Sequence, residues 1–348
     1  MAALWAWMPD GATMYKDVMT ATPSEKVFGL TDWQGSQLVS GDISWSGLAS
    51  SQTSAGNWRI ALIAVGLYVV MIPSLKGYVA RYGKFDVKDL AFCWNSLLSI
   101  FSWCGVFACV PVMATTLAEK GLYFTCCAPC QWYSNNLCGF FVTLFIWSKI
   151  FELFDTVLLL AAKKPVIALQ WWHHSTVLLY CWHSNSAGIA TGLWFAAMNY
   201  SVHSVMYGYF AITATKYRKL ISPYAIFITL AQLLQMVVGM FVTIKAVLYQ
   251  VDGKECHVNR TNSVLGLLMY FSYFVLFLKL FIDNYVLKKK EEYHLPPKKK
   301  SSLLKLVRST TRDLSDHPLL SPHKKWVSED DEEATTSASD SSPGKKRQ

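Results

Sequence analysis

The sequence predicts an all-α integral membrane protein with seven transmembrane helices, and three observations predict this fold class. Hydrophobic residues make up 53% of the 348 residues, with a mean hydropathy of +0.26. They fall in blocks of about 18 residues or more, which is the length of a transmembrane helix. Short basic segments separate alternate blocks, as the cytosolic loops of a membrane protein do.

Seven apolar blocks follow one another along the chain. The predicted spans are residues 59–80, 90–114, 138–161, 166–182, 188–212, 224–249 and 262–287. They form one membrane domain, residues 58–287. Residues 1–57 are polar and rich in Ser, Thr and Gly, and we expect a loosely structured, non-cytosolic leader. Residues 288–348 are charged and rich in Ser and Pro, a composition that predicts a disordered tail.

Four basic segments orient the predicted bundle. They are RYGKFDVK (81–88), Lys163 with Lys164, KYRK (216–219) and KKK (288–290), after the first, third, fifth and seventh spans. Because they alternate, all four lie on one side, which is the cytosol by the positive-inside rule. The C-terminus is then cytosolic. The net charge of +9 gathers in these segments and in the tail, which favours membrane orientation over nucleic-acid binding.

The cysteines agree with this orientation. Cys126, Cys127, Cys130 and Cys138 lie around the second connection, and Cys256 lies in the sixth. Both connections fall on the non-cytosolic side, where disulfides persist, so we expect Cys256 to pair with one of the four. The CxxC at 127–130 has no second ligand pair nearby, so no metal site is predicted.

Two short motifs concern modification and location. Asn259 begins a glycosylation sequon, Asn-Arg-Thr, on the non-cytosolic side. Lys345 and Lys346 stand fourth and third from the end of the chain, the positions of a dilysine signal for retrieval to the endoplasmic reticulum. The sequence therefore predicts a multi-pass protein of the endoplasmic reticulum membrane.

Polar residues interrupt four of the spans at helical spacing. They are Lys149, Glu152 and Asp155 in the third span, His173 and His174 in the fourth, Asn199, His203 and Tyr207 in the fifth, and Thr229, Gln232 and Gln235 in the sixth. Intramembrane ionisable groups usually face a bundle interior or a watery cavity, and they are candidates for function. A structural ion pair between Lys149 and Glu152 and interhelical hydrogen bonds from the glutamines are open alternatives.

The histidines restrict the chemistry. By this assignment only His173, His174 and His203 lie in the core of the bundle, too few to ligate the two irons of a membrane desaturase. The sequence has no nucleophile elbow of a serine or cysteine hydrolase. Imidazole itself then acts as nucleophile or base, and no cofactor is predicted.

These motifs resemble those of the ELO family of very-long-chain fatty acid elongases. The family's KxxExxDT is similar to Lys149–Thr156, its HxxHH to QWWHH (170–174), its NxxVHxxMYxYY to Asn199–Phe210 and its TxxQxxQ to Thr229–Gln235. The resemblance covers residues 59–290 in order. The sequence departs from the family pattern at Gln170, where the first box histidine is expected, and at Phe210, where the last tyrosine is expected.

The resemblance implies condensation of a fatty acyl-CoA with malonyl-CoA to a 3-ketoacyl-CoA, CoA and CO₂, in an apolar tunnel closed at its far end. It implies that His173 attacks the acyl thioester. His174, His203 and Asn199 would orient groups or stabilise the enolate oxygen, and Asp155 would fix an imidazole tautomer. The expected substrate-binding residues are Lys149, Glu152, Gln170, Tyr207, Gln232 and Gln235, with Lys163 and Lys164 for the CoA phosphates.

The substrate and partners are expected from the same resemblance. The stretch LQWWHHSTVLLYCW (169–182) is similar to members that elongate saturated and monounsaturated chains, whereas the Gln-containing box is shared with some enzymes for polyunsaturated chains, the alternative. An alternative of another class is a non-enzymatic seven-helix transporter or receptor. The expected partners are membrane lipid, 3-ketoacyl-CoA reductase, 3-hydroxyacyl-CoA dehydratase and enoyl-CoA reductase, with NADPH used only by the reductases. Homo-oligomerisation is left open.

Overall fold

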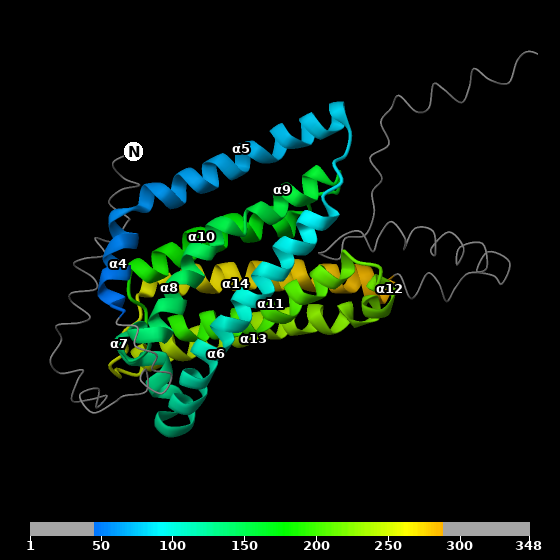
Figure 1. The fold of residues 1–348 in the computed structure, drawn as a ribbon. Helices are drawn as coiled ribbons and strands as arrows, with labels where there is room; N and C mark the ends of the chain where they lie inside the picture. Colours follow the sequence, from blue (N-terminus) through cyan, green and yellow to red (C-terminus); the bar gives the residue numbers. More distant parts are fainter. Residues whose placement is uncertain (1–44, 288–348) are drawn as a thin grey trace, which may run out of the picture.

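The chain forms a helix at each of the seven predicted spans (Figure 1). The structure, a computed structural model, describes residues 45–287. The long elements are α5 (Trp58–Tyr82), α6 (Lys88–Cys127), α8 (Asn136–Phe151) with α9 (Phe154–Ala161), α10 (Ala168–Ser186), α11 (Gly192–Thr213), α13 (Ala225–Val251) and α14 (Arg260–Phe281) with the π-helix η4 (Ile282–Leu287). The short ones are α4 (Gly47–Gly56), α7 (Gln131–Ser134), α12 (Arg218–Ile221) and η3 (Ser222–Tyr224).

Within residues 45–287, five helical stretches are long and apolar enough to cross a membrane. They are Trp58–Tyr82, Lys88–Cys127, Asn136–Ala161, Arg218–Val251 and Arg260–Leu287, and they coincide with the first, second, third, sixth and seventh predicted spans. The remaining two, α10 and α11, carry the polar motifs, which lower their hydropathy. The structure therefore confirms an all-helical membrane protein within the described residues, and the count of seven spans stays a prediction.

The outer surface of the helices is apolar. Leu67, Phe107, Leu234 and Leu268 each expose more than half of their surface, at 67%, 67%, 63% and 63%. Large side chains this exposed in contiguous helices fit contact with lipid rather than with water.

Glycines let neighbouring helices approach closely. A Cβ on Gly239 of α13 would lie 2.6 Å from the ring of Tyr270 on α14, and a Cβ on Gly105 of α6 would collide with the ring of Tyr200 on α11. Helix packing in membranes relies on small residues of this kind, because van der Waals contact replaces the hydrophobic effect there.

Residues 47–56 correct the prediction of a loosely structured leader over residues 1–57. They form α4, which Ser46 caps by accepting a hydrogen bond from Ala49 N at 3.3 Å. The helix is fixed to α10, because Trp182 Nε1 donates to Ser54 O at 2.7 Å and Asn185 Nδ2 donates to Ser54 Oγ at 2.8 Å. The rest of the predicted leader up to residue 44 lies outside the described residues, as do the tail 288–348 and Lys345 and Lys346.

The third predicted span is broken within its polar motif. Helix α8 ends at Phe151 and α9 begins at Phe154. At the break Leu153 N, Asp155 N and Thr156 N bond to carbonyls three residues back, at 3.3, 3.1 and 3.2 Å, instead of four. This tighter winding rotates α9 relative to α8, so that Asp155 does not continue the face of Lys149 and Glu152.

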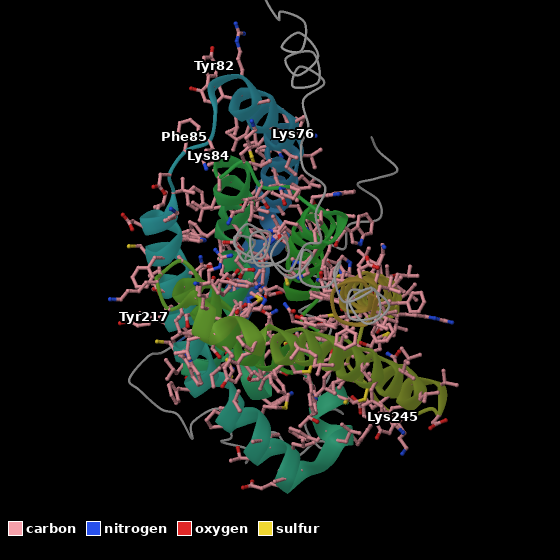
Figure 2. The ribbon with its side chains drawn as sticks, turned by 90° about the vertical axis from the view of Figure 1, so that its right-hand side faces the viewer. Lys76, Tyr82, Lys84, Phe85, Tyr217 and Lys245 are labelled. Carbon is pink, nitrogen blue, oxygen red and sulfur yellow. A yellow bond between two sulfur atoms is a disulfide. The ribbon has the colours of Figure 1, made fainter. Side chains whose placement is uncertain are left out.

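The three basic segments within the described residues lie at one end of the bundle, and the Cys127–Cys256 disulfide lies at the other. Figure 1 shows α12 and the connection from α5 to α6 at one end, and α4 and α7 at the other. Figure 2 views the molecule from the α12 end, where Lys84 and Phe85 follow α5 and Tyr217 precedes α12. This separation agrees with the sidedness that the charge pattern predicts.

Candidate active site

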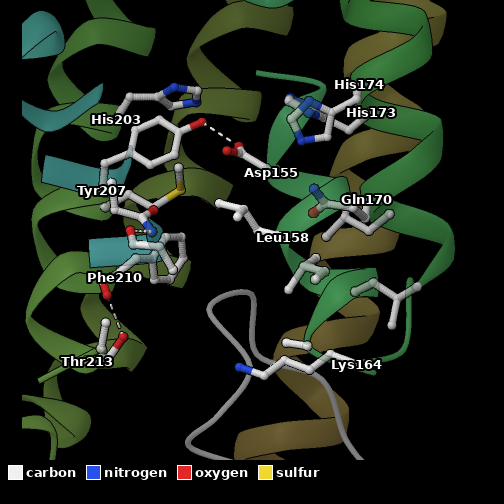
Figure 3. A pocket seen from close by; sticks show the side chains of 18 of the residues that line it. Asp155, Leu158, Lys164, Gln170, His173, His174, His203, Tyr207, Phe210 and Thr213 are labelled. Carbon is white, nitrogen blue, oxygen red and sulfur yellow. Dashed lines mark hydrogen bonds between the residues drawn. The ribbon is translucent and has the colours of Figure 1, made fainter. Parts of the chain in front are cut away.

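A cavity of about 690 Å³ opens at the α12 end and reaches the histidines in the bundle. Side chains of α6, α9, α10, α11 and α13 line it. Figure 3 shows His173 and His174 on one wall, His203 and Tyr207 on the facing wall, and Asp155 between them. Gln170, Asn199, Gln232 and Gln235 also line this cavity. The structure thus brings most of the predicted site residues together from four separate helices.

His173 occupies the junction of two cavities. It lines the large cavity and also a narrow second one of about 60 Å³, which runs on between α8, α10, α11 and α14. Its ring centroid lies 4.9 Å from that of Tyr273, whose hydroxyl donates to the His173 carbonyl at 3.2 Å. His174 lines only the large cavity; its ring centroid lies 5.2 Å from that of His173, at 88°. The adjacent histidines therefore share the large cavity, and His173 also reaches the narrow one.

A buried ion pair stands behind the cavity wall. Lys149 Nζ lies 2.7 Å from Glu152 Oε1, and their side chains are 1% and 4% exposed. Ser148 Oγ also donates to Glu152 Oε1, at 3.0 Å. Neither Lys149 nor Glu152 lines either of these two cavities, and their role in substrate binding stays a prediction. The structural reading of the pair holds.

This ion pair reaches the cavity through Asn199. Lys149 Nζ donates to Asn199 Oδ1 at 3.1 Å, and Asn199 Nδ2 lies 3.1 Å from His203 Nε2. Because Asn199 and His203 are four residues apart on α11, the contact follows from helical geometry. The ammonium group therefore fixes the amide orientation, and the amide fixes the ring.

Nδ1 of His174 and Oε2 of Glu152 are among the buried polar atoms that have no hydrogen-bond partner in the described residues. His174 is 5% exposed and Glu152 is 3% exposed. Buried polar atoms normally have a partner. For His174, which lines the large cavity, a group inside the cavity can supply it.

Asp155 has different partners from those expected. Trp94 Nε1 of α6 donates to its Oδ1 at 2.7 Å, and the hydroxyl of Tyr207 on α11 donates to its Oδ2 at 2.8 Å. Neither bond is to an imidazole, and the expected role of Asp155 in fixing a tautomer stays a prediction. The carboxylate instead ties three helices together at the level of His203, whose ring centroid lies 5.2 Å from that of Tyr207.

Gln170 is held by a hydroxyl pair. Its Nε2 donates to Thr156 Oγ1 at 3.3 Å, and Thr156 Oγ1 lies 2.8 Å from the hydroxyl of Tyr68 on α5. Gln170 is 2% exposed and lines the large cavity. The glutamine therefore has a fixed position where the related motif has histidine.

The glutamines of α13, Gln232 and Gln235, also line the large cavity. Gln232 Nε2 lies 3.2 Å from the sulfur of Met206. Gln235 lines both cavities, as His173, Asn199 and Met236 do. Their polar atoms therefore contribute to the cavity wall, which favours the ligand-binding reading that the sequence left open.

Four cations surround the mouth of the large cavity: Lys84, Lys88, Lys164 and Arg218. They come from three of the four predicted cytosolic segments. Lys163, at φ +56° after α9, does not line either of the two cavities, and its expected role in binding CoA phosphates stays a prediction. Lys84, Lys88 and Arg218 were not predicted as site residues, although their segments were identified as basic.

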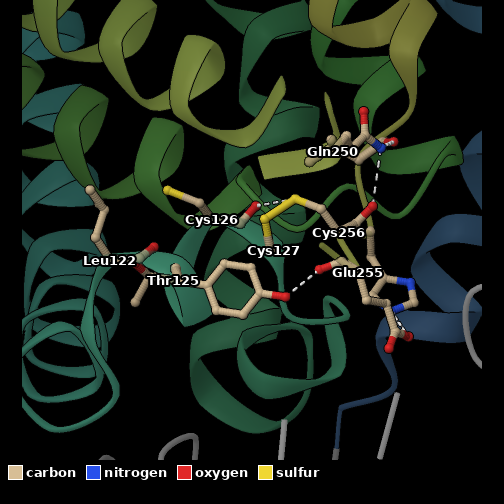
Figure 4. The surroundings of a disulfide bond; sticks show 10 residues. Leu122, Thr125, Cys126, Cys127, Gln250, Glu255 and Cys256 are labelled. Carbon is tan, nitrogen blue, oxygen red and sulfur yellow. Dashed lines mark hydrogen bonds and ion pairs between the residues drawn. A yellow bond between two sulfur atoms is a disulfide. The ribbon is translucent and has the colours of Figure 1, made fainter. Parts of the chain in front are cut away.

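At the other end, Cys256 forms a disulfide with Cys127 of the four candidates (Figure 4). Asn259 caps α14, since its Oδ1 accepts from Asn262 N at 2.9 Å. The described residues contain no cluster of three or more His, Cys, Asp or Glu side chains that could hold a metal ion. The predictions that no metal or cofactor is needed and that Asn259 is glycosylated stay predictions.

Comparison with known proteins identifies the family. The profile of the GNS1/SUR4 (ELO) family matches residues 53–293. A protein named very long chain fatty acid elongase 4 of Trypanosoma cruzi is 41% identical over 230 residues, 64% of this chain and 79% of the relative. Fatty acid elongase 1 of Trypanosoma brucei brucei is 38% identical over 278 residues, 72% of this chain and 89% of the relative.

A third relative comes from an animal. Very long chain fatty acid elongase 6 of Drosophila melanogaster is 35% identical over 234 residues, 66% of this chain and 73% of the relative. The profile match covers the helices that build both cavities and the ion pair behind them. The chain therefore belongs to the GNS1/SUR4 (ELO) family, and the predicted relationship to the very-long-chain fatty acid elongases is confirmed.

Proposed function

We propose that this membrane enzyme condenses a saturated or monounsaturated long-chain acyl-CoA with malonyl-CoA through an acyl-histidine at His173. The observation that carries this proposal is the place of His173 at the junction of the two cavities. A thioester carbonyl at this point has its CoA portion in the wide, basic-mouthed cavity and its hydrocarbon portion in the narrow one. Family membership does not favour the alternative of a non-enzymatic transporter or receptor.

In the first half-reaction a ring nitrogen of His173 attacks the thioester carbonyl carbon. The carbon–sulfur bond breaks, the ring loses its proton, and CoA leaves as the thiol. In the second, malonyl-CoA enters the same cavity and loses CO₂. The enolate carbon attacks the acyl group, the bond from the acyl carbon to the ring nitrogen breaks, and the ring takes up a proton from solvent to regenerate His173. No metal or other cofactor takes part in these steps.

Nitrogen atoms on both walls of the large cavity support the developing negative charge. His174, with its unsatisfied Nδ1, lies beside His173, and the Asn199–His203 pair lies on the facing wall. Preorganised donors stabilise an enolate oxygen more effectively than water does, since they need no reorganisation. Lys149 keeps Asn199 in place from behind.

The mouth suits the phosphates of CoA. Lys84, Lys88, Lys164 and Arg218 form a cationic ring there, and lysine and arginine are the usual phosphate ligands in proteins. Both substrates carry CoA, so one ring serves both half-reactions in turn. Because the predicted cytosolic segments supply this ring, substrates would enter from the cytosol, with the cytosolic C-terminus on the same side.

The narrow cavity is the proposed acyl tunnel. Its volume of about 60 Å³ is that of about two water molecules, so side chains must move when an acyl chain enters. Met236 and Met269 line it, and methionine adapts readily because its side chain is unbranched. The alternative substrate is a polyunsaturated acyl chain, which is curved at its double bonds and would have to fit between the same side chains of the narrow cavity.

Other expectations complete the proposal. Seven spans would enclose the tunnel in the endoplasmic reticulum membrane. The 3-ketoacyl-CoA product would pass to a 3-ketoacyl-CoA reductase, then to a 3-hydroxyacyl-CoA dehydratase and an enoyl-CoA reductase.

The test is covalent capture of the intermediate. Purified protein is incubated with labelled palmitoyl-CoA without malonyl-CoA, and hydroxylamine-sensitive label is measured, with condensation assayed in parallel. We expect label on the wild type and on the control His183→Gln, and none on His173→Ala. Label that persists in His173→Ala at the wild-type level would refute the acyl-histidine assignment. Condensation assays with saturated, monounsaturated and polyunsaturated acyl-CoAs then identify the substrate class.

A further inference from the structure

The far end of the narrow cavity is built from helix α7 and the connection from α10 to α11. Along α10 the cavity lining runs from His173 to Asn185, about 18 Å at the rise of an α-helix, and ends at Tyr133, Ile189 and Gly192. The hydroxyl of Tyr133 donates to Ile189 O at 2.6 Å. A Cβ on Gly192 would collide with this hydroxyl. We refer to Tyr133, Ile189 and Gly192 as the tunnel floor.

A chain of backbone contacts connects the floor to the disulfide. Ala190 N, next to Ile189, donates to His257 O at 3.0 Å, and His257 N donates to Cys127 O at 2.9 Å. Cys127 is bonded to Cys256, the neighbour of His257. The Ile189 side of the floor is therefore two backbone hydrogen bonds away from the disulfide.

The Tyr133 side of the floor starts from the same cysteine. Tyr133 lies on α7, six residues after Cys127, and its backbone N donates to Cys130 O at 3.1 Å. It is 4% exposed and Ile189 is 3% exposed, so neither can shift without changing the volume beside it. Both halves of the floor thus depend on the position of Cys127.

Side chains also hold residues 253–259, the segment that carries Cys256. Tyr123 donates from its hydroxyl to Glu255 O at 2.6 Å, and Gln250 Nε2 donates to Cys256 O at 3.1 Å (Figure 4). It has no regular secondary structure between Gly253 and α14. The disulfide is its covalent link to α6, across 129 residues of sequence.

From this geometry we propose that the Cys127–Cys256 disulfide positions the tunnel floor and thereby limits the length of acyl chain that the enzyme elongates. The inference rests on the proposed acyl tunnel. When a thiol reductant converts the disulfide to two cysteine thiols and is itself oxidised to its disulfide, the 253–259 segment loses its covalent link to α6. The Ile189 loop then moves away from Tyr133, and longer chains are accepted.

The test measures product length rather than total activity. Purified full-length protein receives an equimolar mixture of saturated acyl-CoAs from fourteen to twenty-two carbons with labelled malonyl-CoA, and products are resolved by mass spectrometry. We expect Cys127→Ser, Cys256→Ser and the double variant to raise the ratio of longest to shortest products at least threefold, to the same extent. Gly192→Ala, which moves Tyr133 into the cavity, should lower that ratio. Cys104→Ser, an exposed cysteine of α6, is the matched control.

The outcomes separate the two proposals. An unchanged length distribution in the disulfide variants, or an equal loss of all products, overturns the role of the disulfide while condensation by the wild type still stands. No condensation by folded wild type overturns the proposed function itself. If the serine variants do not fold, the wild type is assayed with and without a phosphine reductant, with thiol counting to show that the disulfide has opened. A constant length distribution after opening then overturns the inference.

Discussion

Lys149 Nζ lies 3.1 Å from the Oδ1 of Asn199, fifty residues further along the chain, while it also pairs with Glu152 at 2.7 Å. One buried ammonium group therefore connects an ion pair on α8 with the amide that contacts His203. Burial of two charges in a membrane domain is costly unless both are well paired. The buried charges therefore hold Asn199 and His203 in place in the active-site wall, and they add little to the free energy of unfolding.

Removal of this ammonium group should destabilise the protein strongly. Lys149→Met leaves the Glu152 carboxylate buried without its partner, and breaking a buried pair costs about 3–5 kcal/mol. The matched control is Lys279→Met, because Lys279 pairs with Asp283 at 2.9 Å with 71% of its side chain exposed, and exposed pairs contribute about 0–1 kcal/mol. Thermal unfolding in detergent measures both. Equal losses for the two variants would contradict this account.

Contacts within one helix were predictable from the sequence, and contacts between helices were not. The spacing of Lys149 and Glu152 offered their ion pair as an alternative to substrate binding, and the spacing of Asn199 and His203 on one face of α11 is the geometry of their contact. The partners of Asp155 are 61 and 52 residues away. Helical periodicity says which face a residue occupies, but not which neighbouring helix covers that face.

Helix α4 and two residues of the site, Tyr68 and Trp94, also escaped prediction, for local reasons. Helix α4 is rich in Ser and Gly and lacks an apolar stripe, so its sequence carried no helix signal. Its stability comes from tertiary hydrogen bonds to Trp182 and Asn185. Tyr68 and Trp94 reach the site from spans in which a single aromatic residue does not stand out among many.

The two donors to Asp155 should contribute to stability nearly equally. Tyr207→Phe and Trp94→Phe each remove one hydrogen bond to a carboxylate, worth about 1.5–3 kcal/mol. The control is Tyr209→Phe, which lies on the same helix but does not donate to Asp155 in the structure. Unfolding temperatures compare the three. A loss for Tyr209→Phe as large as for Tyr207→Phe would show that the effect is not specific to the carboxylate.

Tyr68 should affect catalysis through Gln170 without contact with substrate. Tyr68→Phe removes the hydroxyl next to Thr156, and the hydrogen bond from Gln170 then loses its support. We expect kcat to fall about three- to tenfold, corresponding to about 0.5–1.5 kcal/mol for one neutral hydrogen bond, with KM unchanged. Tyr78→Phe, an exposed tyrosine of the same helix, should leave both constants at wild-type values.

Gln170→His, which keeps a ring donor for Thr156, should retain activity. Its complete loss would contradict the positioning role.

The cationic mouth should determine the affinity for both CoA substrates. Lys164 lines the cavity and its neighbour Lys163 does not, so Lys164→Gln and Lys163→Gln form a matched pair with the same change in charge. For Lys164→Gln and Arg218→Gln we expect KM for malonyl-CoA and for acyl-CoA to rise about tenfold, while kcat changes little, because the charges bind the ground state and the transition state equally. The difference from wild type should shrink as ionic strength rises, since salt screens partly exposed charges. Steady-state kinetics at low and high salt measure this. A KM for Lys163→Gln raised as much as for Lys164→Gln would indicate a general effect of net charge and would remove the phosphate-binding role from the mouth.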